Sequence, residues 1–117
     1  MPSLEKLSII IEEIKTIKSK TEQAITLMCK LMKMQMFNDG NKRTAMLIAN
    51  HELIKNGRGI ISIPQENKVE FGVKLIEYYE NEEKLEELKK FIYVNCLNGI
   101  KTRWGERWKK TKLSKGG

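Results

Sequence analysis

Apolar residues recur at spacings of three and four through most of the first hundred positions of the chain. These spacings place side chains on one face of an α-helix, so the pattern predicts helices nearly throughout. We therefore expect an all-α fold class, a single domain of about five helices. The expected inward-facing sets are Leu7, Ile10, Ile11, Ile14 and Ile17; Ala24, Ile25, Met28, Leu31 and Met32; Ala45, Ile48, Ala49, Leu53 and Ile54; Val69, Val73, Ile76 and Tyr79; and Leu85, Leu88, Ile92 and Cys96.

Short polar residues and glycines mark where the first three helices begin and end. Ser3 is a candidate N-cap of the first helix, and Ser19 or Thr21 of the second, because their hydroxyls accept hydrogen bonds from free helical N–H groups. The third helix is expected from about residue 42 to 56, with Gly57 as its C-terminal cap.

The second half of the chain begins with a short segment rich in isoleucine, residues 58–63. We expect it to be an extended piece or a stub of strand. Pro64 stands where a fourth helix would begin, and the fifth is expected over about residues 82–98, ended by Gly99.

The composition is that of an ordinary soluble globular protein, with 40% hydrophobic and 32% charged residues. No apolar run approaches the roughly 20 residues of a membrane span, and the first residues lack the apolar core of a secretion signal. The two cysteines, Cys29 and Cys96, are interpreted as small buried hydrophobes rather than a disulfide framework or metal ligands. We therefore expect a cytoplasmic localisation.

The net charge of +7 is concentrated at the end of the chain. Residues 101–117 hold seven basic residues and one acidic residue, a net charge of +6, which leaves +1 for the first hundred. We expect a helical domain over 1–100 and a basic tail over 101–117. If the tail is helical, Trp104 and Trp108 share a face. The tail then has three interpretations: a nucleic-acid contact, a membrane-surface contact, or tryptophans that dock on the domain.

The segment with the clearest chemical potential is residues 35–45, where one helix ends, a turn intervenes and the next helix begins. A helix start after a glycine turn presents free N–H groups and the positive end of the helix dipole, which suits an anion. Lys42 and Arg43 in the first turn oppose the usual preference for acidic residues there, and Asp39 is a candidate magnesium ligand. The alternative is a tight turn in which Asp39 or Asn41 caps the helix and the two cations are solvated.

This segment resembles the signature of the Fic/Doc family, HxFx(D/E)GN(G/K)R. The matching positions are Phe37, Asp39, Gly40, Asn41, Lys42 and Arg43. The resemblance covers roughly residues 5–100 and implies a Fic-like helical bundle, in which Phe37 anchors the motif loop. Most members of the family transfer AMP from ATP to a hydroxyl of a target protein, while the Doc branch transfers the terminal phosphate.

The resemblance also implies a role for each remaining motif residue. Asp39 would bind Mg²⁺, and the backbone amides around Gly40 and Lys42 would hold a phosphate of ATP. The Asn41 side chain would reach the same phosphate, and Arg43 would hold another. The partners implied are a target protein with a modifiable hydroxyl and an antitoxin or inhibitory partner.

The chain departs from the family pattern at the catalytic base, because Gln35 stands where the motif has histidine. Glutamine does not accept a proton near neutral pH, and loss of a general base typically costs about 10²–10⁴-fold in rate. His51 lies about 15 Å further along the helix, at about 1.5 Å per residue, and is interpreted as a structural or surface residue. Lys42 is the residue of the Doc branch, and Met46 replaces a second arginine that is common in the family.

Two further family features bear on activity. No pair of strands precedes residue 35 to form the β-hairpin flap that docks target segments. Residues 62–67 fit the letters of an inhibitory pattern of the family but are interpreted as a polar entry to the fourth helix.

The sequence therefore favours a Fic-like transferase that moves AMP from ATP to a target hydroxyl, with its activity limited by Gln35. The alternatives are a catalytically degenerate nucleotide-binding or interaction module, a Doc-like phosphotransferase, and a basic nucleic-acid-binding protein.

Overall fold

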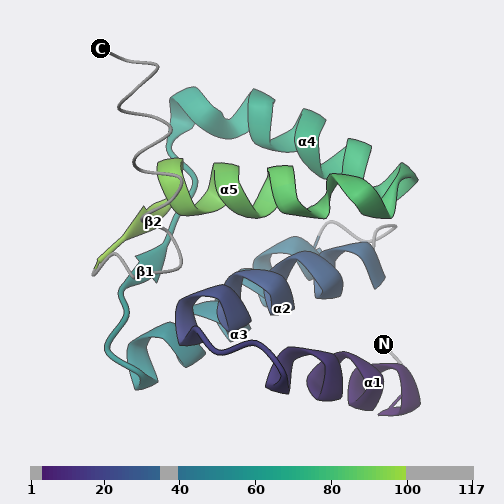
Figure 1. The fold of residues 1–117 in the computed structure, drawn as a ribbon. Helices are drawn as coiled ribbons and strands as arrows, with labels where there is room; N and C mark the ends of the chain where they lie inside the picture. The colour runs from purple at the N-terminus through teal and green to yellow at the C-terminus, as the bar shows by residue number, and fades with distance from the viewer. Residues whose placement is uncertain (1–3, 35–39, 100–117) are drawn as a thin grey trace.

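The computed structural model describes residues 4–34 and 40–99. These residues form five α-helices and one two-stranded sheet (Figure 1). An all-α domain of about five helices is therefore confirmed. The elements are α1 (Leu4–Lys15), α2 (Lys20–Met34), α3 (Gly40–Lys55), β1 (Ile60–Ile61), η1 (Gln65–Asn67), α4 (Lys68–Glu80), η2 (Glu82–Lys84), α5 (Leu85–Asn95) and β2 (Leu97–Asn98), where η denotes a short 3-10 turn.

The helices form two layers, with α4 and α5 side by side above α2 and α3 (Figure 1). Helix α2 contacts α1, α3 and α5, and α1 lies at the outer edge of the lower layer. The expected inner face of α2 is buried throughout, and Ile25, Met28 and Cys29 are fully buried. Within the described ranges, no helix combines the length and apolarity needed to cross a membrane.

The expected caps of α2 and α3 are present. The Glu22 N–H donates to the Ser19 hydroxyl at 3.2 Å, so Ser19 caps α2, whereas Thr21 is buried inside the helix. Gly57 has φ +66°, and the Arg58 N–H donates to the Leu53 carbonyl at 2.8 Å. The left-handed glycine and this hydrogen bond, which joins residues five positions apart, form a Schellman motif. The motif ends α3 where the sequence predicts.

The Asn50 side chain links helix α3 to the sheet. Its amide donates to the Ile61 carbonyl at 3.0 Å and accepts from the Ile61 N–H at 2.7 Å. The next residue, Ser62, donates instead toward the β2 side, to the Cys96 carbonyl at 2.9 Å. Backbone groups alternate in direction along a strand, so Asn50 satisfies the outward groups of β1 as a third strand would. The predicted strand stub is confirmed, and this is why so short a strand is stable.

Two glycines let the sheet close beyond the end of β2. A Cβ atom at Gly59 would lie 2.2 Å from the Asn98 carbonyl oxygen, and one at Gly99 would lie 2.4 Å from the Arg58 carbonyl oxygen. Both residues have positive φ, +120° and +155°. Any side chain would therefore collide with backbone as well as strain it.

The structure corrects the inner face of the fourth helix. Val69, Val73 and Ile76 were expected to face inward, but they are 81%, 52% and 57% exposed. Two apolar stripes follow helical spacing in this segment, and the core takes the one whose aromatic rings bury more surface. The buried residues of α4 are Phe71, Leu75 and Tyr78.

Three other expected core residues are also more exposed than predicted. Ile11 and Ile48 are 42% and 41% exposed at the edges of the α1 and α3 interfaces, and Ile54 is exposed near the end of α3. On α3 the small residues Ala45 and Ala49 face the core with Leu53, so α3 approaches α2 through its alanines.

Helix boundaries differ most in the second half of the chain. The fourth α-helix begins at Lys68 because η1 follows Pro64. The fifth begins at Leu85 rather than at residue 82, because the Asn81 side chain accepts from the Glu83 N–H and caps η2. It ends at Asn95 rather than at residue 98, because Leu97 and Asn98 pair with β1.

Gly59→Ala is expected to lower the free energy of unfolding by at least about 2 kcal/mol, because the new Cβ meets the Asn98 carbonyl at a strained φ. Gly72→Ala is the matched control. Its Cβ would meet nothing within 4 Å inside α4, so a gain of about 0.5–1 kcal/mol is expected. Urea unfolding followed by circular dichroism measures both. Equal effects of the two substitutions would contradict the close approach of the glycines.

Candidate functional site

The first turn of α3 holds the positive charge that the motif predicts. Helix α3 begins at Gly40, and its first turn contains no acidic residue. Lys42 and Arg43 are both exposed there. The first N–H groups of a helix have no partner within the helix, so this turn combines free donors, the positive end of the dipole and two cations. It is suited to an anion.

The packing of α3 on α2 fixes this turn in place. Ala45 follows the turn and is buried, and Ala49 and Leu53 continue the buried face. Because these three residues lie on one side of the helix, the first turn cannot rotate without exposing them. The cations are thus held at the edge of a rigid helix pair.

The structure places part of the motif. Gly40, Asn41, Lys42 and Arg43 share the first turn of α3. The Asn41 side chain is outside what the structure describes, and so are Gln35, Phe37 and Asp39. The predictions for the catalytic position, the loop anchor and the magnesium ligand therefore stay predictions.

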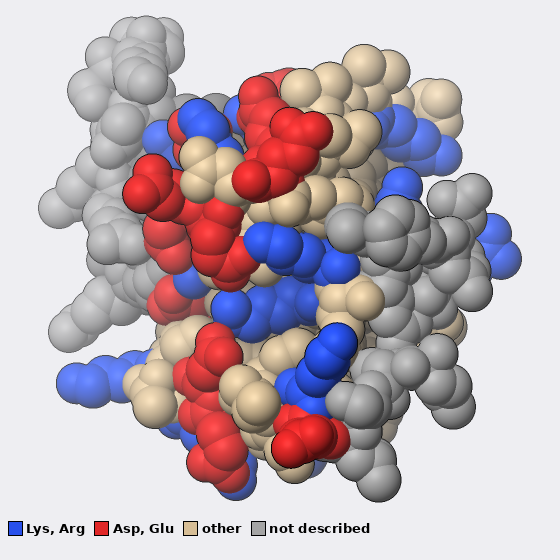
Figure 2. All heavy atoms as spheres, turned by 90° about the vertical axis from the view of Figure 1, so that its right-hand side faces the viewer, with Lys and Arg blue, Asp and Glu red and all other residues tan. Residues whose placement is uncertain are grey.

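A pocket of about 270 Å³ lies at the C-terminal end of α2, the helix that precedes the motif in sequence. Lys30, Lys33 and Met34 line it from α2, directly before the motif. Its other lining residues, from α1, α4 and η2, are Lys6, Ile9, Ile10, Tyr78 and Glu82. Basic and acidic side chains face one another across this side of the molecule (Figure 2).

Two lysines of this pocket, Lys30 and Lys33, form ion pairs that join α2 to α1 and η2. The Lys30 ammonium lies 3.2 Å from Glu13 on α1 and 3.7 Å from Glu82 on η2. Lys33 donates to Glu82 as well, and its ammonium lies 4.7 Å from the centre of the Tyr78 ring. This hydrogen bond, followed by the positive charge of both lysines, lowers the pKa of Glu82. Burial, and then the charge of Glu82, raise the pKa of Tyr78.

This network was not predictable from the sequence. Lys33 and Glu82 are 49 residues apart. The paired charges stand on different helices, so no local spacing links them. The local sequence signal is a run of four glutamates and one lysine over residues 82–87, which is also typical of a solvated helix start.

One comparison with known proteins finds a family model that matches the N-terminal part of the chain. Residues 3–53 match the model of the Fic/DOC family. The resemblance indicated by the motif is thereby confirmed over 51 of the 117 residues. No curated protein and no solved structure matches the chain significantly.

The Fic/DOC segment, residues 3–53, includes α1, α2 and most of α3, and so contains the whole motif. Its one histidine, His51, lies in the C-terminal part of α3, away from Lys42 and Arg43 in the first turn. The His51 side chain is 77% exposed, with Nδ1 3.5 Å from a Glu52 carboxylate oxygen. Its interpretation as a surface residue is confirmed.

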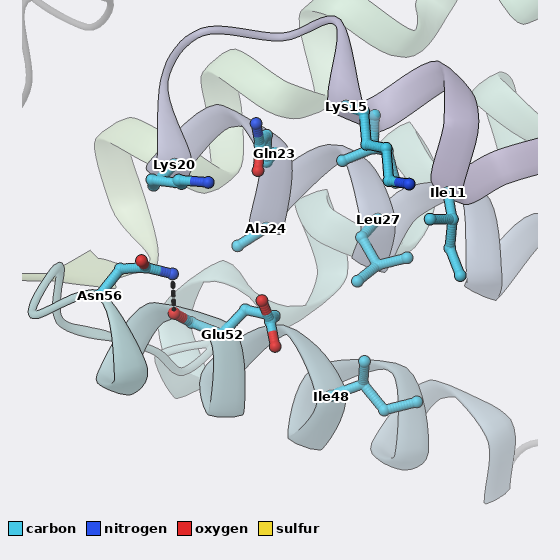
Figure 3. Close-up of a pocket in the computed structure, with 10 residues that line it drawn as sticks. Ile11, Lys15, Lys20, Gln23, Ala24, Leu27, Ile48, Glu52 and Asn56 are labelled. Atoms are coloured by element: carbon cyan, nitrogen blue, oxygen red, sulfur yellow. Dashed lines mark hydrogen bonds between the residues drawn. The ribbon is translucent and has the colours of Figure 1, made fainter.

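The Fic/DOC segment also forms a second pocket, of about 320 Å³, between its three helices (Figure 3). The floor is apolar and the rim carries Lys15, Lys20 and Glu52, whose backbone carbonyl accepts from the Asn56 amide at 2.8 Å. The pocket meets α3 at Ile48 and beyond, so it is separate from the first turn.

A buried cation on α5 joins this helix to α2 of the Fic/DOC segment. Lys89 is 3% exposed, and its ammonium donates to Glu22 at 2.7 Å and to Glu86 at 3.0 Å. Burial raises the pKa of the neighbouring Cys29 thiol to about 12 and that of Cys96 to about 11. Both cysteines are free and buried, as expected, and the described ranges contain no group of three metal-binding side chains.

The lowered pKa of Glu82 provides a test of its pairing with Lys33 across the pocket. The Glu82–Lys33 pair contributes stability above the unfolded pKa of the glutamate, and this contribution is lost as the pH falls through the lower folded pKa. In Lys33→Met, the Glu82 midpoint in an NMR titration is expected to rise toward the ordinary carboxyl value. Lys55→Met, a substitution of an exposed lysine on α3, is the control and should leave the midpoint unchanged. An unmoved midpoint in Lys33→Met would refute the pairing.

Proposed function

We propose that the first turn of α3 binds the phosphates of Mg²⁺-ATP and that the protein transfers AMP to a hydroxyl of a target protein at a low rate. The observation that carries this proposal is the cationic first turn, with Lys42 and Arg43 exposed and no acidic residue, inside the Fic/DOC segment.

The charge of this turn supports binding of a phosphate rather than a neutral ligand. A cation at a helix N-terminus is unfavourable by about 0.3–1 kcal/mol, and an anionic ligand reverses the sign of that interaction. The two cations thus slightly lower the free energy of unfolding, and a bound phosphate would offset this loss.

The resemblance to the Fic/DOC family implies a role for each of these motif residues. Backbone amides of Gly40 and Lys42, with the Asn41 and Arg43 side chains, would hold the phosphates, and Asp39 would hold Mg²⁺. Magnesium commonly binds through one or two carboxylates together with phosphate oxygens, so one aspartate beside this turn is a suitable donor set. When bound, the ion neutralises phosphate charge.

In the proposed transfer, the oxygen of a target hydroxyl bonds to the α-phosphorus and the bond to the β-phosphate breaks, which releases pyrophosphate. The hydroxyl proton must leave in the same reaction. Because Gln35 does not accept a proton, the hydroxyl proton passes to water. We therefore expect the transfer rate to be about 10²–10⁴-fold below that of a protein with histidine at position 35. Positioning and charge neutralisation, which carry most of phosphoryl-transfer catalysis, remain available.

Lys42 favours a second candidate, transfer of the γ-phosphate, because the Doc branch has lysine at this position. A binding module that no longer catalyses transfer is the third. A target protein and an antitoxin or inhibitory partner belong to the same proposal, as does a cytoplasmic location.

Arg43→Ala is expected to weaken Mg²⁺-ATP binding roughly 10- to 100-fold, since a hydrogen bond to a charged group contributes about 1.5–3 kcal/mol. Calorimetric titration measures the affinity. Lys55→Ala, at the opposite end of α3, removes the same charge from the chain and should bind like the wild type. Absence of binding in the wild type, or equal affinity in Arg43→Ala, would leave the first turn without a nucleotide role.

Gln35→His distinguishes the candidate reactions. We expect label from α-labelled ATP to reach protein about 10²–10⁴-fold faster in Gln35→His than in the wild type, because the substitution restores a general base. Label arriving from the γ-position instead would establish phosphate transfer. Tight binding with no label from either position would identify a non-catalytic module.

A further inference from the structure

One face of α4 carries apolar side chains that no part of the described structure covers. Val69, Val73 and Ile76 are 81%, 52% and 57% exposed, and their spacing of four and three aligns them in one stripe. The opposite face of α4 already contributes Phe71, Leu75 and Tyr78 to the core, so the stripe is an outer surface. Single exposed apolar residues are ordinary, but an aligned stripe of three is a typical contact surface.

Acidic residues border this stripe. Glu70 and Glu77 lie within four residues of Val73, and Glu80 lies four residues after Ile76; all three glutamates are exposed. The lysines of α4 lie elsewhere: Lys68 is its first residue, and the Lys74 ammonium lies 6.0 Å from the centre of the Phe91 ring. The stripe therefore suits a segment that is both apolar and basic.

The tail, residues 101–117, has this chemistry. It carries a net charge of +6 and both tryptophans of the chain, Trp104 and Trp108, at the same spacing of four as Val69 and Val73. Opposite charges along an apolar contact make the contact specific for one partner and also stabilise it. We propose that the tail packs its two tryptophans on the α4 stripe of the same molecule, with its basic residues beside Glu70, Glu77 and Glu80.

The geometry allows this contact within one chain. Gly99, the last described residue, lies against Gly59 next to the sheet, and β2 lies near the N-terminal end of α4 (Figure 1). Trp104 is five residues and Trp108 nine residues beyond Gly99, which span up to about 17 Å and 30 Å when extended. Helix α4 has 13 residues and is therefore about 20 Å long. The tail is long enough to lie along it.

Charge favours the α4 stripe over the pocket between α1, α2 and α3. The pocket in Figure 3 also exposes isoleucine and leucine, but its rim has two lysines, Lys15 and Lys20, and one glutamate, Glu52. A strongly basic tail is repelled by that rim and attracted by the border of the stripe. The proposal does not depend on nucleotide binding or transfer.

Tryptophan fluorescence of the full chain tests the contact, because every tryptophan lies in the tail. Docking predicts emission shifted to shorter wavelength and protection from acrylamide, relative to a free peptide of residues 101–117. Val73→Asp should remove both signs of docking and give the values of the peptide. Ile54→Asp, at an exposed apolar position on α3, is the control and should behave like the wild type. Far-UV circular dichroism verifies that each variant is folded.

A charge variant tests the electrostatic part separately. Glu70→Lys combined with Glu77→Lys is expected to lose the protection, whereas Glu5→Lys on α1 should retain it. Wild-type emission equal to that of the free peptide would overturn the proposal. So would protection that survives Val73→Asp, which would place the tail elsewhere, or protection that grows with protein concentration, which would place it on a second copy.

Discussion

The burial of α2 is the constraint on which the rest of the described structure depends. Eight of its 15 residues are buried, and it contacts α1, α3 and α5. Burying most of one helix on several sides removes a large apolar area from water and leaves little freedom in how its neighbours pack. The motif follows the last residue of α2, and α3 begins within the motif and packs on α2, so this buried helix positions the first turn of α3.

Much of this fold was predictable from the sequence, because its signals are local. The spacing of Ala24, Ile25 and Met28 predicts α2, and Ser19 and Gly57 predict helix ends through bonds to neighbours a few residues away. Which stripe of α4 faces inward was not predictable, since both have helical spacing and only the shape of the core distinguishes them. The hydrogen bond between Asn50 and Ile61 was not predictable either, because it depends on how the chain turns after α3 to place β1 beside it.

The candidate site divides in the same way. The cations at the start of α3 could be read from Lys42 and Arg43 beside a glycine turn, since helix polarity is a local property. The ion pairs of Lys30 and Lys33 with Glu82 join parts of the chain about 50 residues apart and appear only when α2 and η2 are brought together. The place of residues 62–67 in the fold agrees with their interpretation as a polar entry to the fourth helix. They follow β1, beyond the C-terminal end of α3, whereas Arg43 is at the opposite end, and Glu66 is an exposed residue of η1.

The buried thiols have a practical consequence. Only a thiolate reacts readily with alkylating reagents, and burial keeps both native cysteines protonated and out of contact with solvent. A cysteine introduced at an exposed position would thus be the preferred point of attachment in the folded protein, with no need to replace Cys29 or Cys96. Spin labels or fluorophores can then be attached to chosen helices, and distances within the molecule can be followed while the core keeps its natural residues.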